Sequence, residues 1–442
     1  MNRSKLRRVA AAAALTVGSL SSGPIAYATE GYFLEGYGTR EKGVAGAGAA
    51  DSRDPLAISI NPAGLVDVGE QFTGGLTAFS PDRGYTTSGP GFVAQGSVES
   101  GRGLFPIPNA GYSRPIDSTS AWGVAAYGNG GMNTTYSSNY ASQYYPNPYF
   151  CPKPGVYCGG NAGVDLNQAF LSAGYAQRFG ILSLGVAPVL AIQIFKARGL
   201  SGFSSYSVDP TNLSDHSYSW SVGAGVRAGA QLNVTGQLRV GLAASTPIWT
   251  TKFSQYSGLF AGGGGFDIPA NITAGVAFDI LPTLTLLADW KHIFYSQVAS
   301  VGHSSQLPYL FGSANGPGFG WSDVDAITFG AEWRATPDWT FRVGYAHNNN
   351  PIQSRDVTIN ILAPGVVTDH ISGGVSYRVT PNSTIDLAAV VSPKNSVSGI
   401  EVTPAGANPF RTITLYMSEF EITAGWTYKF DATPARAIVA KY

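Results

Sequence analysis

The sequence predicts an all-β fold: a transmembrane antiparallel β-barrel of about 14 strands with an N-terminal hatch in the lumen. Three observations predict it. Only 12% of the 442 residues are charged, about half the usual fraction in soluble proteins, while glycine and aromatic residues are abundant. The chain contains no apolar stretch long enough for a membrane-spanning helix. Many segments alternate between large apolar and small or polar side chains, which is typical of strands with one lipid-facing side.

Residues 1–28 are expected to be a cleaved signal peptide. Four basic residues precede a short apolar segment, and Ala26 and Ala28 supply the small side chains that signal peptidase requires. Cleavage leaves 23 basic and 27 acidic residues, a net charge of −4, which argues against a nucleic-acid partner. Export, low charge and strand alternation together predict the outer membrane of a Gram-negative cell. A secreted soluble β-protein is the alternative on composition alone.

The strands are recognised by their period of two. Near the C-terminus, Ile422, Trp426 and Phe430 lie on one face, with Glu421 and Thr423 on the other. Fourteen such segments are predicted, at 70–80, 101–114, 119–131, 164–179, 181–198, 216–233, 236–253, 268–279, 283–298, 323–335, 338–347, 367–380, 382–393 and 412–430.

The connections alternate in length, which favours a barrel over a soluble sandwich. Short turns are expected at one end of the strands and long external loops at the other. The long loops are predicted near 81–100, 132–163, 199–215, 254–267, 299–322, 348–366 and 394–411.

The remaining segments lie on either side of the barrel, which is expected to span 70–430. Residues 29–69 do not alternate and are expected to form a hatch, because a barrel of this size is too wide for its own side chains to fill. The final aromatic of the barrel is Phe430 or Tyr442. Phe430 ends the clearer alternation, which leaves 431–442 as a C-terminal extension. Most charges on inward faces are expected to form a structural network with the hatch.

The hatch carries a motif that resembles a known family. Asn61, Pro62 and Ala63, followed by Gly64-Leu65 and preceded by the glycine-rich segment 43–48, resemble the hatch of the long-chain fatty-acid transporter family. That family also includes hydrocarbon channels of the toluene and xylene type. Residues 338–345 resemble one of its later strands. The resemblance implies passive transport of small hydrophobic molecules, which leave sideways into the membrane through a kink in the third strand.

Gly128, Asn129, Gly130 and Gly131 are the expected lateral gate. Glycines within a strand favour a bulge or a break in pairing, whereas at its end they form an ordinary turn. The residues alone leave both interpretations open, and the family resemblance favours the kink.

The expected substrate-binding residues are Lys196, Arg198, Ile192 and Ser322. A fatty-acid carboxylate needs a cation, and the resemblance implies basic residues on two lumen-facing strand positions. These positions align with Ile192 and Ser322, and Lys196 and Arg198 are close enough to replace the first cation. The sequence therefore leaves fatty acids and neutral hydrocarbons as alternative substrates.

Cys151 and Cys158 are the only cysteines and are expected to form a disulfide in an external loop. No histidine lies near them, so a zinc site is not expected. The aromatic side chains of this loop either capture apolar substrate or pack the loop. No cofactor, metal or enzymatic activity is expected, since no convincing catalytic constellation is found. The expected partners of this monomer are outer-membrane lipid, lipopolysaccharide and hydrophobic small molecules. An adhesin or structural barrel without transport is the alternative.

Overall fold

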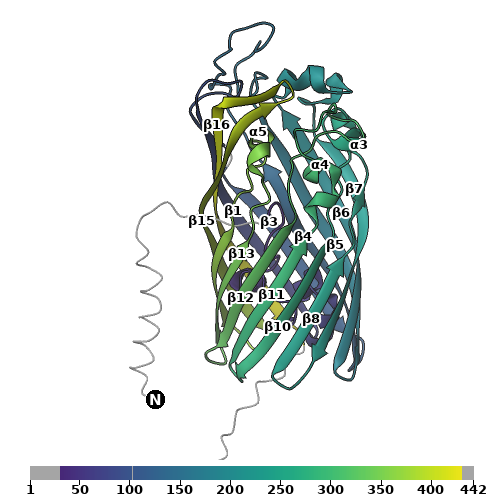
Figure 1. The fold of residues 1–442 in the computed structure, drawn as a ribbon. Helices are drawn as coiled ribbons and strands as arrows, with labels where there is room; N and C mark the ends of the chain where they lie inside the picture. Colours follow the sequence, from purple (N-terminus) through teal and green to yellow (C-terminus); the bar gives the residue numbers. More distant parts are fainter. Residues whose placement is uncertain (1–29, 102, 431–442) are drawn as a thin grey trace, which may run out of the picture.

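A single closed sheet forms the molecule, a computed structural model that describes residues 30–101 and 103–430 (Figure 1). The predicted signal peptide, 1–28, and the predicted extension, 431–442, lie outside the described residues. Each long strand pairs antiparallel with the next, and β16 pairs with β1 to close the barrel. The strands are β1 Gln71–Ser88, β2 Ser97–Glu99, β3 Phe105–Pro115, β4 Ser120–Asn133, β5 Gly163–Phe179, β6 Leu182–Arg198, β7 Ser219–Asn233, β8 Leu238–Ser245, β9 Trp249–Thr250, β10 Asn271–Leu281, β11 Leu284–Ile293, β12 Val324–Arg334, β13 Trp339–Asn348, β14 Asp369–Arg378, β15 Ser383–Thr403 and β16 Gly406–Lys429.

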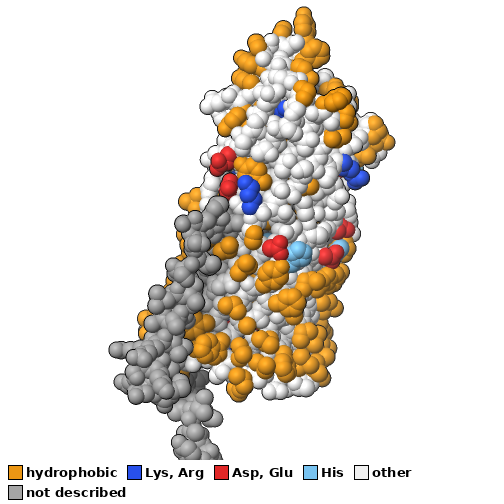
Figure 2. Space-filling model, turned by 60° about the vertical axis from the view of Figure 1, so that its left-hand side comes forward, with side chains coloured by type: hydrophobic (Ala, Val, Ile, Leu, Met, Phe, Trp, Pro, Cys, Tyr) orange, Lys and Arg blue, Asp and Glu red, His pale blue; other side chains and the backbone are white. Residues whose placement is uncertain are grey.

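The two short strands, β2 and β9, pair only with the ends of β1 and β7, so the wall consists of 14 long strands. This confirms the predicted fold class. On β12, for example, Ile327 and Phe329 are exposed, while Thr328 between them is buried. Figure 2 shows the result: hydrophobic side chains cover the lower wall, and acidic and histidine side chains lie at the upper edge of this band. Such a band fits the hydrocarbon layer of a membrane.

The two ends of the barrel differ as expected. Tight turns join the strands at the lower end in Figure 1, and long loops with short helices join them at the upper end. No helix within the described part of the chain is both long and apolar enough to cross a membrane. The loop helices are η3 Ser201–Tyr206, η4 Pro210–Asn212, η5 Ser254–Tyr256, α3 Ala261–Gly264, η6 Tyr295–Gln297, α4 Ala299–Gly302, η7 Ser354–Asp356 and α5 Val357–Asn360.

Several predicted boundaries are wrong. The predicted loop 394–411 is instead a continuation of the β15–β16 hairpin above the apolar band, and β1 extends to Ser88. The predicted strand 236–253 ends at Ser245, where Pro247 lacks the N–H needed for the ladder. The predicted strand 283–298 ends at Ile293, before η6.

The N-terminal segment, residues 30–69, lies inside the barrel and contributes no strand to its wall (Figure 1). It contains α2 Thr39–Gly43, η1 Pro55–Ser59 and η2 Pro62–Asp67, almost entirely buried. Strand glycines let its backbone approach the wall. A Cβ atom at Gly241 would lie 1.9 Å from the Ala49 carbonyl oxygen.

Ion pairs anchor this segment to the inner wall. Arg40 Nε lies 2.9 Å from Glu332 Oε2, and Arg239 Nη2 lies 3.0 Å from Asp51 Oδ1. Lys42 pairs with Glu421 of β16. In addition, Asp289 Oδ2 accepts hydrogen bonds from the backbone N–H groups of residues 48 and 49. These inward charges therefore bind the segment to the wall.

Candidate functional site

The ladder between β3 and β4 stops partway up the wall. The first pair at the lower end is Pro115 with Ala121, and the last is Asn109 with Tyr127. Above this last pair both strands continue upward without pairing to each other. Residues 105–108 of β3 and 128–133 of β4 therefore border a gap, which we call the window.

Two prolines account for the missing pairs. Successive N–H groups of a strand point to opposite sides, so Pro106 and Pro108 lack donors on the same edge. β3 stays paired with β1 along this stretch, up to the pair Phe79–Phe105. The edge without donors is therefore the one that faces β4.

The glycine-rich segment of β4 is a bulge, not a turn. The register against β5 shifts between Gly128 and Gly130, and pairing then continues to Asn133. Asn129, at the bulge, points inward: its Nδ2 donates to Gln168 Oε1 at 2.9 Å, and its Oδ1 accepts from Tyr37 Oη at 3.1 Å. The strand is thus irregular where it borders the window.

The N-terminal segment pairs with the free edge of β4. Phe33 forms an antiparallel bridge with Gly130, and Leu34 N donates to Asn129 O at 3.1 Å. A Cβ atom at Gly130 would lie 1.7 Å from the Tyr32 carbonyl oxygen, so only glycine permits this contact. Residues 32–34 thus occupy part of the edge that β3 leaves unpaired.

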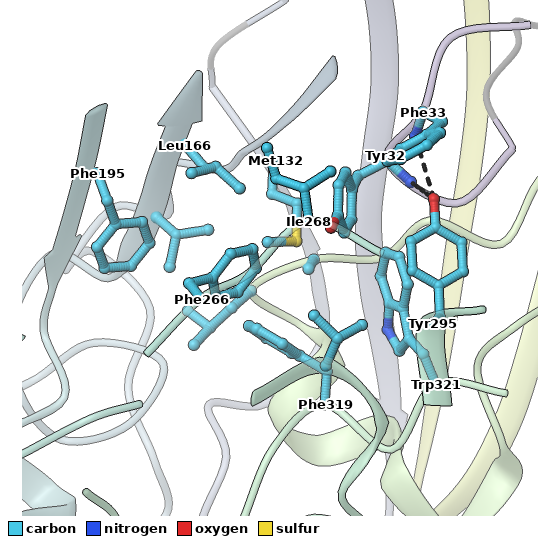
Figure 3. Packing of buried hydrophobic residues seen from close by; sticks show 14 of the residues in the cluster. Tyr32, Phe33, Met132, Leu166, Phe195, Phe266, Ile268, Tyr295, Phe319 and Trp321 are labelled. Atoms are coloured by element: carbon cyan, nitrogen blue, oxygen red, sulfur yellow. Dashed lines mark hydrogen bonds between the residues drawn. The ribbon is translucent and has the colours of Figure 1, made fainter. Parts of the chain in front are cut away.

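Tyr295, just above β11, holds these residues in place. Its hydroxyl accepts from Tyr32 N at 3.1 Å and from Phe33 N at 3.2 Å, and donates to Glu30 O at 2.7 Å. Figure 3 shows Tyr32 beside Tyr295 and Trp321. The rings of Tyr32 and Trp321 are 5.9 Å apart. Lys291 Nζ adds an ion pair of 2.8 Å to Glu30.

A cavity of about 660 Å³ lies at the window. Its lining includes inward side chains, such as Ile107 and Phe170, and outward ones, such as Ala126, Leu171 and Trp220. A closed sheet keeps these two faces apart. A cavity lined by both therefore passes through the wall.

The membrane side of the wall is also hollowed. A second, apolar depression of about 590 Å³ shares Ala110, Ala126 and Leu171 with the cavity and continues across β5, β6 and β7. An apolar path therefore runs from the lumen to the lipid-facing surface.

Arg83 lies at the upper rim of the cavity. From β1 its Nε donates to the Asn133 carbonyl at 2.6 Å and its Nη1 to the Pro81 carbonyl at 3.0 Å. Its guanidinium carbon lies 5.5 Å from the centre of the Phe105 ring. Arg83 thereby links β1 to β4 above the window. The sequence interpretation missed this residue because it assigned 81–100 to a loop, although alternation with buried neighbours continues through Tyr85.

The four expected substrate-binding residues do not come together. Ile192 lines the cavity from the outward side. Lys196 and Arg198 alternate with buried Phe195 and Ala197, so they share the outward face of Ile192 and do not line the cavity. We expected both side chains to face the lumen, but on β6 the lumen-facing positions are 195 and 197. Lys196 Nζ instead lies 5.4 Å from the Tyr218 ring centre.

Ser322 lies in the loop before β12 and does not line the cavity, although its neighbour Trp321 does. Its hydroxyl donates to the Pro351 carbonyl at 3.2 Å.

The hatch motif is an anchor between the N-terminal segment and the wall. Asn61 caps η2 by accepting from Ala63 N at 3.1 Å, and its Nδ2 donates to Ala49 O at 2.7 Å and to Ala230 O of β7 at 3.1 Å. Pro62 begins η2, where no N–H is needed. Asn61 thus binds both the segment itself and the barrel.

The external loop contains the expected disulfide between Cys151 and Cys158, with Cα atoms 4.8 Å apart. Its aromatic residues divide into two groups. Tyr136 and Tyr157 are buried and donate to backbone carbonyls of the loop after β13, whereas Tyr149 and Phe150 are 90% and 71% exposed. Within 30–101 and 103–430, no group of histidine, cysteine and acidic residues is arranged to hold a metal ion.

Comparison with known proteins gives the same architecture. Residues 212–411 match the family model described as outer membrane protein transport protein (OMPP1/FadL/TodX). A FadL homologue of Pseudomonas aeruginosa is 16% identical, with a TM-score of 0.66 over 90% of this chain and 100% of its own. The toluene transporter TodX of P. putida is 17% identical, with a TM-score of 0.66 over 90% of this chain and 99% of its own.

The toluene transporter TbuX of Ralstonia pickettii is 20% identical, with a TM-score of 0.62 over 90% of this chain and 99% of its own. At such identities the likeness establishes the fold. A search of curated proteins finds no match.

Proposed function

We propose that the chain carries small hydrophobic molecules across the outer membrane, since residues 212–411 match the model of the outer membrane transport protein family that includes FadL and TodX. The resemblance predicted from the hatch motif is thereby confirmed. The molecules enter the cavity from the side of the long loops and leave through the window into the hydrocarbon layer.

The observation that carries this proposal is the cavity lined by both faces of the wall. Its lining is mainly apolar, including Phe79, Ile107, Met132, Phe170 and Trp321. An apolar molecule gains about 0.8 kcal/mol per CH₂ when it moves from water into such surroundings. The step from the cavity into lipid is nearly neutral, so the passage needs no energy source.

The N-terminal segment supports a sideways exit. It fills the lumen between the window and the lower end of the barrel, where its buried ion pairs join it to the wall. A straight path downward would require breaking these contacts. We therefore assign residues 30–69 the role of a plug, and residues 128–131 the role of the window's border on β4.

The same proposal covers the partners of the chain. The apolar band contacts outer-membrane lipid and the loops above it contact lipopolysaccharide, and because β16 pairs with β1, the described strands form a sheet without a terminal edge strand that a second copy would have to cover. We propose a monomer that transports and does not catalyse.

The experiment uses vesicles whose outer leaflet is lipopolysaccharide, the layer that apolar solutes cross poorly. Uptake of N-phenyl-1-naphthylamine, which fluoresces in hydrocarbon, reports the passage. Wild-type protein should raise the rate severalfold over empty vesicles, and Ala126→Phe with Ala169→Phe, at the membrane side of the window, should remove most of this gain.

The matched control is Ala331→Phe, on the lipid-facing side of β12 and away from the cavity. It should transport like wild type. Equal rates for empty and protein-containing vesicles would contradict transport, and equal rates for all variants would contradict exit through the window.

A further inference from the structure

The side chain of Tyr32 brings a buried hydroxyl to the cavity. Tyr32 belongs to the N-terminal segment, lines the cavity and is 1% exposed. No residue within 30–101 and 103–430 forms a hydrogen bond with its Oη atom. Burying a hydroxyl without a hydrogen bond is unfavourable, and native proteins contain few such groups. The hydroxyl can therefore donate its hydrogen to a molecule that binds in the cavity.

The polar side chain close to this hydroxyl, Gln168 of β5, is already engaged at both ends of its amide. Its Oε1 accepts from Asn129 Nδ2 at 2.9 Å, and its Nε2 donates to Gln193 Oε1 at 2.7 Å. Gln193 Nε2 in turn donates to the carbonyl of Phe266 at 3.0 Å. These amides form a continuous chain of hydrogen bonds that does not include the Tyr32 hydroxyl.

Aromatic side chains hold the Tyr32 ring in place. The distances between ring centres are 5.0 Å to Tyr295, 5.4 Å to Phe33, 5.9 Å to Trp321 and 6.2 Å to Phe266. In Figure 3 the ring lies between Tyr295 and Met132, which also lines the cavity. A donor that is fixed before binding loses little conformational freedom when a ligand arrives.

We propose that the Tyr32 hydroxyl makes the cavity selective for apolar molecules with one neutral oxygen acceptor, such as alkyl ketones, over hydrocarbons of the same size. This inference rests on the proposed function and names its substrate class. A ketone oxygen accepts the hydroxyl hydrogen, and unlike an alcohol it adds no donor that the apolar lining would have to satisfy. Such a hydrogen bond is favoured because little water competes for it in an apolar cavity.

The test compares undecan-2-one with 2-methylundec-1-ene, in which a CH₂ group replaces the ketone oxygen. Each ligand displaces N-phenyl-1-naphthylamine from the full chain in lipid nanodiscs, and the ratio of variant to wild-type affinity cancels partitioning into lipid. Tyr32→Phe should lower the ketone affinity about fivefold, the effect of one neutral hydrogen bond, and leave the alkene within about twofold.

Tyr127→Phe is the matched control. Tyr127 also lines the cavity, but its hydroxyl already contacts Ser172 Oγ at 3.1 Å and accepts from Arg227 Nη1 at 3.0 Å. Its loss should change both affinities by the same factor, so the ratio of ketone to alkene affinity should stay as in wild type.

Infrared difference spectra of bound undecan-2-one test the contact itself, because hydrogen bonding lowers the stretching frequency of a carbonyl group. The frequency in wild type should be lower than in hydrocarbon solvent, and Tyr32→Phe should return it to the solvent value.

An unshifted carbonyl frequency in wild type would overturn the inference. So would a shift that persists in Tyr32→Phe, an unchanged affinity ratio in Tyr32→Phe, or the same change of ratio in Tyr127→Phe. Failure of both ligands to displace the probe from wild type would instead contradict the proposed function, and the inference with it.

Discussion

Phe33 of the N-terminal segment forms an antiparallel bridge with Gly130 of β4, at the edge that β3 leaves unpaired. One backbone contact thus joins the plug to the border of the window. The contact depends on the absence of a side chain at Gly130 and on the hydroxyl of Tyr295, which accepts a hydrogen bond from Phe33 N.

Gly130→Ala should detach residues 30–34 from β4. A Cβ atom would lie 1.7 Å from the Tyr32 carbonyl oxygen, so either the bridge breaks or β4 shifts. We expect a local loss of about 2 kcal/mol, seen as faster amide hydrogen exchange at residues 32–34. Gly236→Ala, where a Cβ atom meets nothing within 4 Å, is the control. Unchanged exchange in Gly130→Ala would contradict the close approach.

Tyr295→Phe should loosen the same residues without steric change. It removes the acceptor of the buried Tyr32 N–H and leaves the Phe33 N–H only its 3.4 Å contact with the Glu30 carbonyl, at a cost of about 1–3 kcal/mol. Amide exchange at these two positions should accelerate at least about tenfold. Tyr345→Phe removes an exposed hydroxyl contact to Asp369 and should leave both amides as in wild type.

Lys42→Met should destabilise the plug strongly. Lys42 is buried between Glu35 and Glu421, and its removal leaves two buried carboxylates without a cation. Breaking a buried ion pair from one side costs about 3–5 kcal/mol. In gel electrophoresis, the temperature above which the heated protein no longer migrates as a compact folded barrel should fall. Adding Glu421→Gln should recover part of the loss, and no recovery would argue against a charge effect.

Glu41, in α2, should make the stability of the plug depend on pH. Burial raises the pKa of Glu41 to about 7, with repulsion from Asp54 adding to it and hydrogen bonds from Tyr37 N and Gly38 N opposing it. The pKa of Glu41 is higher in the folded than in the unfolded protein. The contribution of Glu41 to the free energy of unfolding is therefore fully present below about pH 4.5 and is lost as the pH rises through about 7. Protease resistance of residues 30–69 should therefore fall over this range.

Glu41→Gln isolates this contribution. The amide oxygen can still accept from Tyr37 N and Gly38 N, but the group no longer titrates. The difference from wild type should grow as pH rises towards 8. A constant difference across the range would show that Glu41 is not the responsible group.

The wall could be predicted from the sequence because lipid enforces the pattern. Ile327 and Phe329 must face hydrocarbon, so alternation on β12 is clear in the residues themselves. Above the membrane this constraint ends. Residues 394–403 of β15 are mostly polar and small, and nothing in their alternation distinguishes a hairpin from a loop.

The candidate site was less predictable for a different reason. The bulge at Gly128–Gly130 follows from glycines that the sequence displays, but the pairing of Phe33 with Gly130 joins residues nearly a hundred positions apart. Arg83 and Glu419, which both line the cavity, lie on neighbouring strands only because β16 closes on β1. Lys196 and Arg198 were misplaced by strand parity, because here the apolar Phe195 and Ala197 face inward and the charged side chains face outward, the reverse of the pattern on lipid-facing strands.

The most direct test of the central claim is an anomalous difference map from crystals soaked with 1-bromohexane. Our account predicts bromine signal within the wall, between β3 and β4, in contact with Ile107, Ala126 or Ile192. Soaked crystals of the variant with Ala126→Phe and Ala169→Phe should lack this peak and retain any signal inside the lumen. Bromine bound only on the lipid-facing surface or only among the upper loops, with none at the window, would contradict passage through the barrel wall.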